Sequence, residues 1–254
     1  MLKRRQPSPP EALPMSALSA VLFDIDDTLF GTTEFAGRAR KNAVRAMCEA
    51  GLDLPIEDVE RELAEVIAEF SSNYSRHFDK LLVRLGQPLR DDASAAIVVA
   101  AGVSAYHDTK FREIAPFPDV IPLLSDLKAA GLRTGIVTHG WTDKQAEKLV
   151  RIGVVPHLDA DAIFISDEIG ISKPNPKLYE TALARMGLEA HEVMYVGDSP
   201  AHDIAPPKSL GMVTAWASRA SKWTPSGESE EADHTIADFE ELRAILREQY
   251  GVPF

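Results

Sequence analysis

The sequence predicts an α/β protein: a doubly wound parallel sheet with a second, all-helical domain inserted into it. From Phe117 onward, short apolar runs alternate with amphipathic segments, and polar residues gather at the carboxyl end of the runs. Thr28 and Thr138 each follow or end a predicted strand, yet they lie 110 residues apart. A plain strand–helix–strand unit takes roughly 30 residues, so the surplus between them must form a structure of its own.

The strands of the sheet are expected where short runs are rich in β-branched and aromatic residues. These runs span 20–23, 133–137, 162–165, 193–196, 212–215 and 234–236. Helices are expected between them because apolar residues recur at helical spacing, over 119–130, 142–152, 176–186, 201–210 and 238–248. The polar stretch 218–232 is predicted to be a loop.

The surplus segment carries four long helical patterns and no strand pattern. They span 35–50, 56–70, 77–85 and 91–111. Because the segment follows the first strand, we expect it to lie over the ligand site as a cap. The predicted organisation is a flexible tail over 1–18, an α/β core domain over 19–30 and 114–254, and a helical cap domain over 31–113.

Composition limits the partners and the cellular compartment. The 254 residues include 39 acidic and 27 basic side chains, for a net charge of −12, which disfavours nucleic acid and anionic membranes as partners. The single cysteine, Cys48, allows no intrachain disulfide, and no run approaches the roughly 18 apolar residues of a membrane span. The basic start leads into prolines rather than an apolar stretch, so we expect a cytoplasmic protein without an export signal.

Four loops that follow predicted strands offer polar side chains. They are 24–28, 138–140, 172–174 and 197–203, and they contain carboxylates, a hydroxyl and an ammonium group. Ligands of an open parallel sheet bind at the carboxyl ends of its strands, where such loops converge. The sequence therefore predicts one polar site built from all four loops.

The first of these loops brings two carboxylates close together. Asp24 and Asp26 are two positions apart, so an extended backbone would put both side chains on one face, about 7 Å apart. Crowded carboxylates either take up a proton or are neutralised by a cation. Oxygen ligands without a histidine or cysteine cluster suit Mg²⁺, and Asp24 and Asp198 are the ligands we expect.

The motifs as a set resemble those of the haloacid dehalogenase superfamily. Its pattern is Asp-x-Asp-x-Thr, then a Ser or Thr, a Lys, and an acidic Gly-Asp loop; here these are 24–28, Thr138, Lys173 and 197–203, in that order. The resemblance runs from about Leu22 to Asp203 and implies a Rossmann-like core with a helical cap. Within the cap, segments 39–43, 77–79 and 105–111 are similar to archaeal-type Mg²⁺-dependent phosphatases of this superfamily.

The resemblance implies a phosphoric monoester hydrolase that acts on a small phosphorylated metabolite through an aspartyl-phosphate. Asp24 would be the nucleophile, and Asp26 would protonate the leaving alcohol and activate water, which requires a raised pKa. Lys173 and Thr138 would stabilise the charge on the phosphoryl group.

The resemblance also implies ligands for metal, phosphate and substrate. The Mg²⁺ ligands would be Asp24, Asp26 (through its backbone oxygen), Asp198 and Asp203. Asp203 would hold a water of the metal or orient Lys173. Phosphate would contact Thr138 and Lys173 and the backbone donors of His139 and Gly140. Candidate substrate-recognition residues in the cap are Asn73, Tyr74, His77, His107 and Lys110. A homodimer is compatible with the resemblance.

Three alternatives use the same fold. A 2-haloacid dehalogenase would direct the same nucleophile at carbon, but Asp26 argues against it, since that reaction needs neither a second acid nor a metal. A phosphomutase would pass the phosphoryl group to a sugar instead of water. A non-catalytic relative would keep the fold alone, which the intact motifs disfavour.

Overall fold

The structure is a computed structural model that describes residues 18–70 and 74–254, so the predicted tail, except Leu18, and the candidate residue Asn73 lie outside the described residues. The described chain forms two compact units. The sheet unit contains 18–24, Asp119–Thr142 and His157–Phe254, and the helical unit contains Ile25–Pro118 and Asp143–Pro156. The helical unit is thus larger than the predicted insertion over 31–113, because it includes the start of the first loop and the segment 143–156.

Six strands form one sheet in which every neighbouring pair is parallel. They are β1 (Ala20–Phe23), β2 (Arg133–Thr138), β3 (Ile163–Ile165), β4 (Val193–Gly197), β5 (Val213–Ala217) and β6 (His234–Ile236). Their order in the sheet is β3-β2-β1-β4-β5-β6, the doubly wound arrangement in which the order reverses between β1 and β4. The predicted fold class is confirmed.

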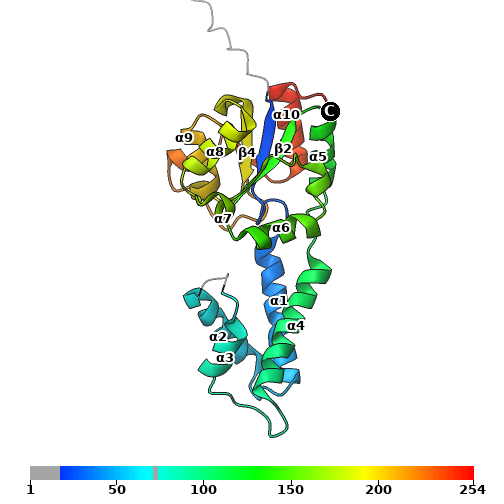
Figure 1. Cartoon of the computed structure of the whole chain (residues 1–254), viewed down its shortest axis with the longest axis vertical. Coiled ribbons are helices and arrows are strands. Elements are labelled where there is room, and N and C mark those ends of the chain that lie inside the picture. The colour runs from blue at the N-terminus through cyan, green and yellow to red at the C-terminus, as the bar shows by residue number, and fades with distance from the viewer. Residues whose placement is uncertain (1–17, 71–73) are drawn as a thin grey trace, which may run out of the picture. The chain divides into compact units, whose positions relative to one another are not determined.

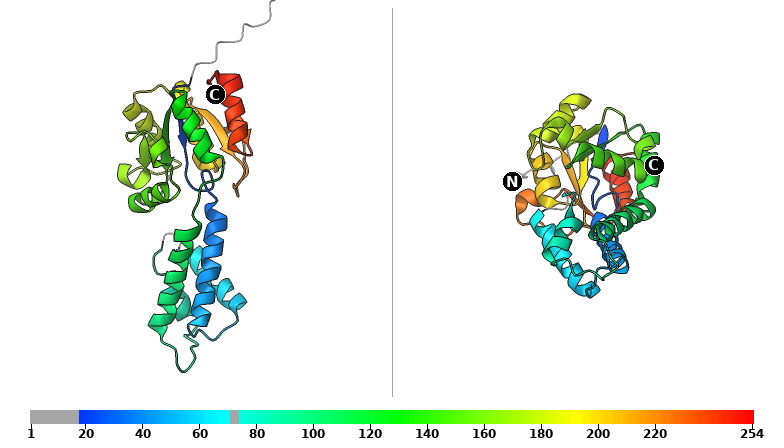
Figure 2. Two further views of the ribbon diagram at one scale, coloured as in Figure 1. Left: turned by 90° about the vertical axis from the view of Figure 1, so that its right-hand side faces the viewer. Right: turned by 60° about the horizontal axis from the view of Figure 1, so that its bottom comes forward.

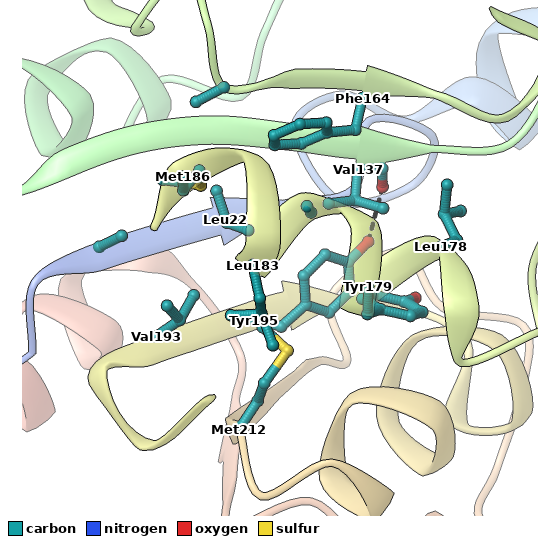
Figure 3. Close-up of a cluster of buried hydrophobic side chains, with 13 residues drawn as sticks. Leu22, Val137, Phe164, Leu178, Tyr179, Leu183, Met186, Val193, Tyr195 and Met212 are labelled. Carbon is teal, nitrogen blue, oxygen red and sulfur yellow. Dashed lines mark hydrogen bonds between the residues drawn. The ribbon is translucent and has the colours of Figure 1, made fainter. Parts of the chain in front are cut away.

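Helices cover both faces of this sheet. In two views, α8 (Lys177–Met186) and α9 (Ala205–Ser209) lie on one face, and α5 (Val120–Ala129) and α10 (Phe239–Tyr250) lie on the other (Figures 1 and 2). Side chains of β1 pack against the helices on both faces, because successive residues of a strand point to opposite faces of the sheet. Leu22 joins the buried cluster that includes α8 (Figure 3), whereas the ring of Phe23 lies 5.7 Å from that of Phe239 on α10.

One predicted helix of the sheet unit differs in type over its first half. Instead of a helix over 201–210, the chain forms a π-helical turn, η3 (Pro200–Ile204), followed by the short α9. Pro206 and Pro207 lack backbone N–H groups and sit at the start of α9, where a helix can tolerate them. The structure also adds the short α7 (Ser166–Ile169) and three 3₁₀ turns, η1 (Val155–His157), η2 (Ala190–Glu192) and η4 (Glu228–Glu230).

The helical unit packs four helices around its own apolar core, and it also includes residues 143–151 of α6 (Thr142–Arg151). The four are α1 (Thr32–Glu49), α2 (Ile56–Phe70), α3 (His77–Arg84) and α4 (Ala95–Glu113). All four contribute to one buried cluster, for example through Met47, Leu63, Phe78 and Val98. Figures 1 and 2 show α1 and α4 running side by side. Their close approach requires Gly102, since a Cβ there would lie 2.8 Å from the Met47 side chain.

No membrane-spanning element is found in the described part of the chain. None of the helices there combines the length with the apolar character that crossing a bilayer requires.

Candidate active site

The first carboxylate of the candidate site stands at the point where the strand order of the sheet reverses. Asp24 directly follows β1, and its backbone N–H continues the ladder by donating to the carbonyl of Val196 at 2.9 Å. Asp198 directly follows β4, the strand on that side of β1. The topology therefore brings together residues 174 positions apart at the place where sheets of this kind bind ligands.

Three buried carboxylates converge there. Asp24, Asp198 and Asp203 each offer an oxygen, and these oxygens all lie within 4.8 Å of one another. The Lys173 ammonium contacts two of the three, at 2.7 Å from Asp24 Oδ1 and 2.7 Å from Asp203 Oδ1. One ammonium against three ionised carboxylates leaves two negative charges, so this donor set fits a divalent cation that prefers oxygen ligands.

Lys173 is held by a third contact that the sequence did not indicate. Its Nζ lies 2.8 Å from the hydroxyl of Tyr195, which itself donates to the Val137 carbonyl at 2.7 Å (Figure 3). Burial by itself would lower the pKa of the Lys173 ammonium, but the charges of Asp203 and Asp24 outweigh it and raise that pKa above its ordinary value. Lys173 is therefore a fixed cation at neutral pH.

Asp203 is fixed from both sides. Its Oδ2 accepts a hydrogen bond from the Ser199 backbone N–H at 3.0 Å, while Oδ1 accepts from Lys173. The Asp203 side chain lies directly over Gly197, where an added Cβ would come within 2.4 Å of the Asp203 Cβ. The glycine of the Gly-Asp motif is thus required by the packing of the second acidic residue of that motif.

Asp198 is anchored through its backbone. Its carbonyl accepts hydrogen bonds from Trp216 Nε1 at 2.8 Å and from Ser221 Oγ at 2.7 Å. Ser221 lies in the polar stretch predicted to be a loop, and that stretch therefore supports the position of a candidate ligand.

Thr138 presents a buried hydroxyl with no hydrogen-bond partner among the described residues. It ends β2 and is 1% exposed, and its Oγ1 is one of a few buried side-chain polar atoms without a partner in that part of the chain. Such a group costs free energy unless something satisfies it, so the hydroxyl is poised for a ligand atom.

The backbone donors expected to bind phosphate after Thr138 differ from the prediction at one position. The Gly140 N–H donates to Ser166 Oγ at 3.0 Å, so an internal hydrogen bond occupies it in this structure. The His139 ring is held nearby, with Nδ1 2.5 Å from Ser172 Oγ. Ser166, directly after β3, thus holds the loop that follows Thr138, a contact that the sequence did not indicate.

Asp26 belongs to the helical unit, and its carboxylate is not part of the metal-binding group found among the described residues. Lys148 Nζ contacts both of its oxygens, at 2.7 and 2.6 Å, and Thr32 Oγ1 donates to Oδ1 at 2.6 Å. Burial would raise the pKa of the Asp26 carboxyl, but the charge and hydrogen bonds of Lys148, with those of Thr32 and Gln145, outweigh it and lower the pKa. The expectation of a raised pKa is therefore wrong in this structure, because α6 supplies a lysine.

The rest of the first loop has structural roles. Asp27 adopts a left-handed backbone, φ 56°, and its carboxylate accepts from the Thr33 backbone at 2.9 Å and from Thr33 Oγ1 at 2.6 Å, at the start of α1.

The candidate recognition residues in the described part of the helical unit form two groups. Tyr74 and His77 contact each other edge to face, with ring centroids 5.5 Å apart. On α4, the His107 ring lies against that of Tyr106, and Lys110 pairs with Glu147 of α6 at 2.8 Å. Their role in recognition stays a prediction.

Comparison with known proteins identifies relatives along most of the chain. The model of the haloacid dehalogenase-like hydrolase family matches residues 18–211. A curated protein of Methanopyrus kandleri, named glyceraldehyde 3-phosphate phosphatase, is 44% identical over 91% of this chain and 98% of its own length. One of Methanocaldococcus jannaschii with the same name is 38% identical over 91% of this chain and 97% of its own length.

Solved structures show the same fold. A HAD phosphatase from Thermococcus onnurineus aligns with a TM-score of 0.62 and 25% identity over 90% of this chain and 98% of its own. A 2-haloacid dehalogenase from Pseudomonas syringae aligns with a TM-score of 0.60 and 23% identity, over 91% of this chain and 99% of its own. This similarity shows the fold alone. With the named phosphatase relatives, these findings confirm the prediction of an enzyme of the phosphatase class: the chain belongs to the haloacid dehalogenase-like hydrolase family.

Proposed function

We propose that this protein is a Mg²⁺-dependent phosphatase that hydrolyses a small phosphorylated metabolite, with Asp24 as the residue that is transiently phosphorylated. The observation that carries the proposal is the buried group at the end of β1. There, carboxylate oxygens of Asp24, Asp198 and Asp203 lie within 4.8 Å of one another, and Lys173 pairs with Asp24 and Asp203. The buried hydroxyl of Thr138 ends the neighbouring strand and has no partner among the described residues.

The excess negative charge of this group supports a divalent cation. Asp24, Asp198 and Asp203 would hold Mg²⁺, with the backbone oxygen of Asp26 as the further ligand that family resemblance implies. When bound, Mg²⁺ would offset the charge of both the carboxylates and the phosphate and so let the two approach each other.

In the first half of the reaction, a carboxylate oxygen of Asp24 would attack the phosphorus. The new bond from Asp24 to phosphorus forms as the bond from phosphorus to the alcohol oxygen breaks. Lys173, fixed by three contacts, would offset charge on the phosphoryl oxygens, and the Thr138 hydroxyl would donate to one of them.

Asp26 would handle the protons. It follows Asp24 by two residues, so the two Cα atoms cannot lie more than about 7 Å apart. The first step needs Asp26 as a carboxyl, the form that the Lys148 contact disfavours in this structure, to give its proton to the departing alkoxide. As a carboxylate it would then take a proton from the water that attacks phosphorus. Cleavage of the bond to Asp24 releases phosphate and returns Asp26 to its protonated form.

The similarity to relatives named glyceraldehyde 3-phosphate phosphatases supports a small triose phosphate as the substrate, and we propose glyceraldehyde 3-phosphate. We also propose that the helical unit acts as the cap that selects this substrate.

The test measures phosphate release from glyceraldehyde 3-phosphate and from p-nitrophenyl phosphate, with millimolar Mg²⁺ or with a chelator, against enzyme-free blanks. The variants are Asp24→Asn and, as a matched control, Asp91→Asn, which makes the same change at an exposed carboxylate. A parallel sample with 2-chloropropionate is assayed for chloride.

We expect turnover by the wild type and by Asp91→Asn with Mg²⁺ only, and none by Asp24→Asn. Undiminished turnover by Asp24→Asn, or full activity with chelator, would refute the proposal. Chloride release without Mg²⁺ would instead favour the dehalogenase. A clear preference for glyceraldehyde 3-phosphate over other sugar and triose phosphates would support the proposed substrate.

A further inference from the structure

The backbone carbonyl of Asp198 accepts two hydrogen bonds from a part of the sheet unit that lies outside the motifs. Trp216 Nε1, on β5, donates to it at 2.8 Å, and Ser221 Oγ, from the segment 218–232, donates at 2.7 Å. Trp216 lies opposite Gly197 in the pairing of β4 with β5, so its side chain can reach the residue that directly follows β4. Two donors on one carbonyl occupy both of its lone pairs and fix the peptide group that follows the Asp198 Cα.

The Ser221 hydroxyl is itself held in place for this contact. It accepts a hydrogen bond from the Trp223 backbone N–H at 3.1 Å, and a hydroxyl that accepts a hydrogen bond becomes a stronger donor. The carbonyl of Trp223 lies 3.3 Å from the same oxygen, so the Asp198 carbonyl at 2.7 Å is the nearer acceptor for its proton. Two residues earlier, Arg219 pairs with Asp119 at 2.8 Å. Ser221 is therefore fixed on both sides, and its bond to Asp198 needs little further ordering.

The anchor acts on a residue that its neighbours repel. Carboxylate oxygens of Asp24, Asp198 and Asp203 lie within 4.8 Å of one another, and like charges that close push one another apart. All three residues belong to the sheet unit, as do Trp216 and Ser221. A cation site that becomes ordered only on binding loses part of its binding free energy, whereas a preformed site does not. Because the two bonds act on the Asp198 backbone, they oppose the repulsion without occupying a carboxylate oxygen.

We propose that Ser221 is a positioning residue for the divalent cation: its hydrogen bond to the Asp198 carbonyl holds this ligand in the arrangement that binds Mg²⁺. The inference rests on the proposed function, in which Asp198 is a ligand of Mg²⁺. It has a reciprocal consequence, because the two equilibria are linked. If the contact strengthens Mg²⁺ binding by some factor, Mg²⁺ strengthens the contact by the same factor. Mg²⁺ should therefore make the segment around Ser221 harder to open.

The experiment measures metal binding directly, by isothermal titration calorimetry with MgCl₂ and without substrate. The test variant is Ser221→Ala, and Ser221→Thr restores a hydroxyl at the same position. The matched control is Ser218→Ala, which removes a hydroxyl of the same segment that donates to another backbone carbonyl, that of Ile236, at 3.0 Å. Ile236 belongs to β6, on the other side of β5 from β4. Melting temperatures in chelator measure the structural effect of each change.

Limited digestion with trypsin measures the opening of the segment. Lys222 is exposed and directly follows Ser221, so cleavage after Lys222 reports on this turn. The digestion is run at low trypsin concentration, where the cleavage rate follows the fraction of open molecules, with Mg²⁺ and with chelator. Mass spectrometry identifies the fragments, and cleavage elsewhere in the chain serves as the internal reference.

We expect Ser221→Ala to raise the dissociation constant for Mg²⁺ by about 3- to 10-fold, below the roughly 10- to 100-fold typical of partners that touch the ligating group itself, because Ser221 acts one peptide group away. Ser221→Thr and Ser218→Ala should bind Mg²⁺ like the wild type. Both alanine variants should lower the melting temperature in chelator to a similar degree, since each loses one neutral hydrogen bond. Saturating Mg²⁺ should slow cleavage after Lys222 in the wild type by the factor found in calorimetry, and should change it little in Ser221→Ala.

An unchanged dissociation constant in Ser221→Ala would overturn the inference, as would an equal rise in Ser218→Ala or cleavage after Lys222 that Mg²⁺ does not slow. If the wild type binds Mg²⁺ and needs it for turnover, such a result leaves the proposed function standing and removes only the role of Ser221. If the wild type binds no Mg²⁺, the metal assignment of the proposed function fails and the inference fails with it.

Discussion

Replacing Tyr195 by Phe tests whether the hydroxyl of one strand residue supports the candidate site. Tyr195 is fully buried, and its hydroxyl connects the Lys173 ammonium at 2.8 Å to the Val137 carbonyl at 2.7 Å. Phe keeps the ring, which packs edge to face against Tyr179 with centroids 5.0 Å apart. The change therefore removes these two short hydrogen bonds, together with a longer 3.5 Å contact from the hydroxyl to Asp203 Oδ1, and almost no apolar contact.

The expected loss follows from those two bonds. A neutral buried hydrogen bond contributes about 1 kcal/mol, and one to a charged group about 1.5–3 kcal/mol, so Tyr195→Phe should lower the free energy of unfolding by about 3 kcal/mol. At roughly 2 °C per kcal/mol for a chain of this size, the melting temperature should fall by about 6 °C.

Urea unfolding followed by tryptophan fluorescence measures this loss where it occurs. The three tryptophans, Trp141, Trp216 and Trp223, all belong to the sheet unit. The matched control is Tyr179→Phe, which loses one hydroxyl bond, to the His202 carbonyl, and should cost about 1 kcal/mol. If Tyr195→Phe costs no more than Tyr179→Phe, the Tyr195 hydroxyl does not support Lys173 as argued here.

Three further predictions concern other parts of the molecule. Gly197→Ala should destabilise the protein by about 1–3 kcal/mol, because the added Cβ would overlap the Asp203 side chain. Gly37→Ala on helix α1 should stabilise it by about 0.5–1 kcal/mol, because no atom lies within 4 Å of the added Cβ there. Urea unfolding of the two variants measures both effects. Mg²⁺ should raise the melting temperature of the wild type in a concentration-dependent way but shift Asp198→Asn little, and an equal shift in both would contradict the ligand assignment. Burial lowers the pKa of His234 below 6.5, so this imidazole binds a proton more readily in the unfolded chain than in the folded chain. The free energy of unfolding should therefore fall as the pH drops below about 6.5, by at most ~1.4 kcal/mol per pH unit from this group. The decline should be smaller in His234→Gln.

Local sequence patterns were enough for most of the sheet unit. β1 and β6 match their predicted spans, because a short run of buried apolar residues between polar loops has few alternatives to a strand in a parallel sheet. The segment 201–210 is helical to within one residue of its predicted ends, but Pro200–Ile204 is a π-helical turn and only Ala205–Ser209 is an α-helix. Apolar spacing by itself does not separate these two kinds of turn.

The sequence by itself determined the family, the order of the strands along the chain, and the carboxylates and lysine of the candidate site. Asp24 and Asp198 can be predicted directly, because each follows a strand whose end is predictable. What only the tertiary structure decided is which groups hold those residues: Tyr195 on Lys173, Gly197 under Asp203, and Lys148 on Asp26. These contacts join positions 6 to 122 residues apart, and their strength depends on distance and burial, which no linear spacing encodes.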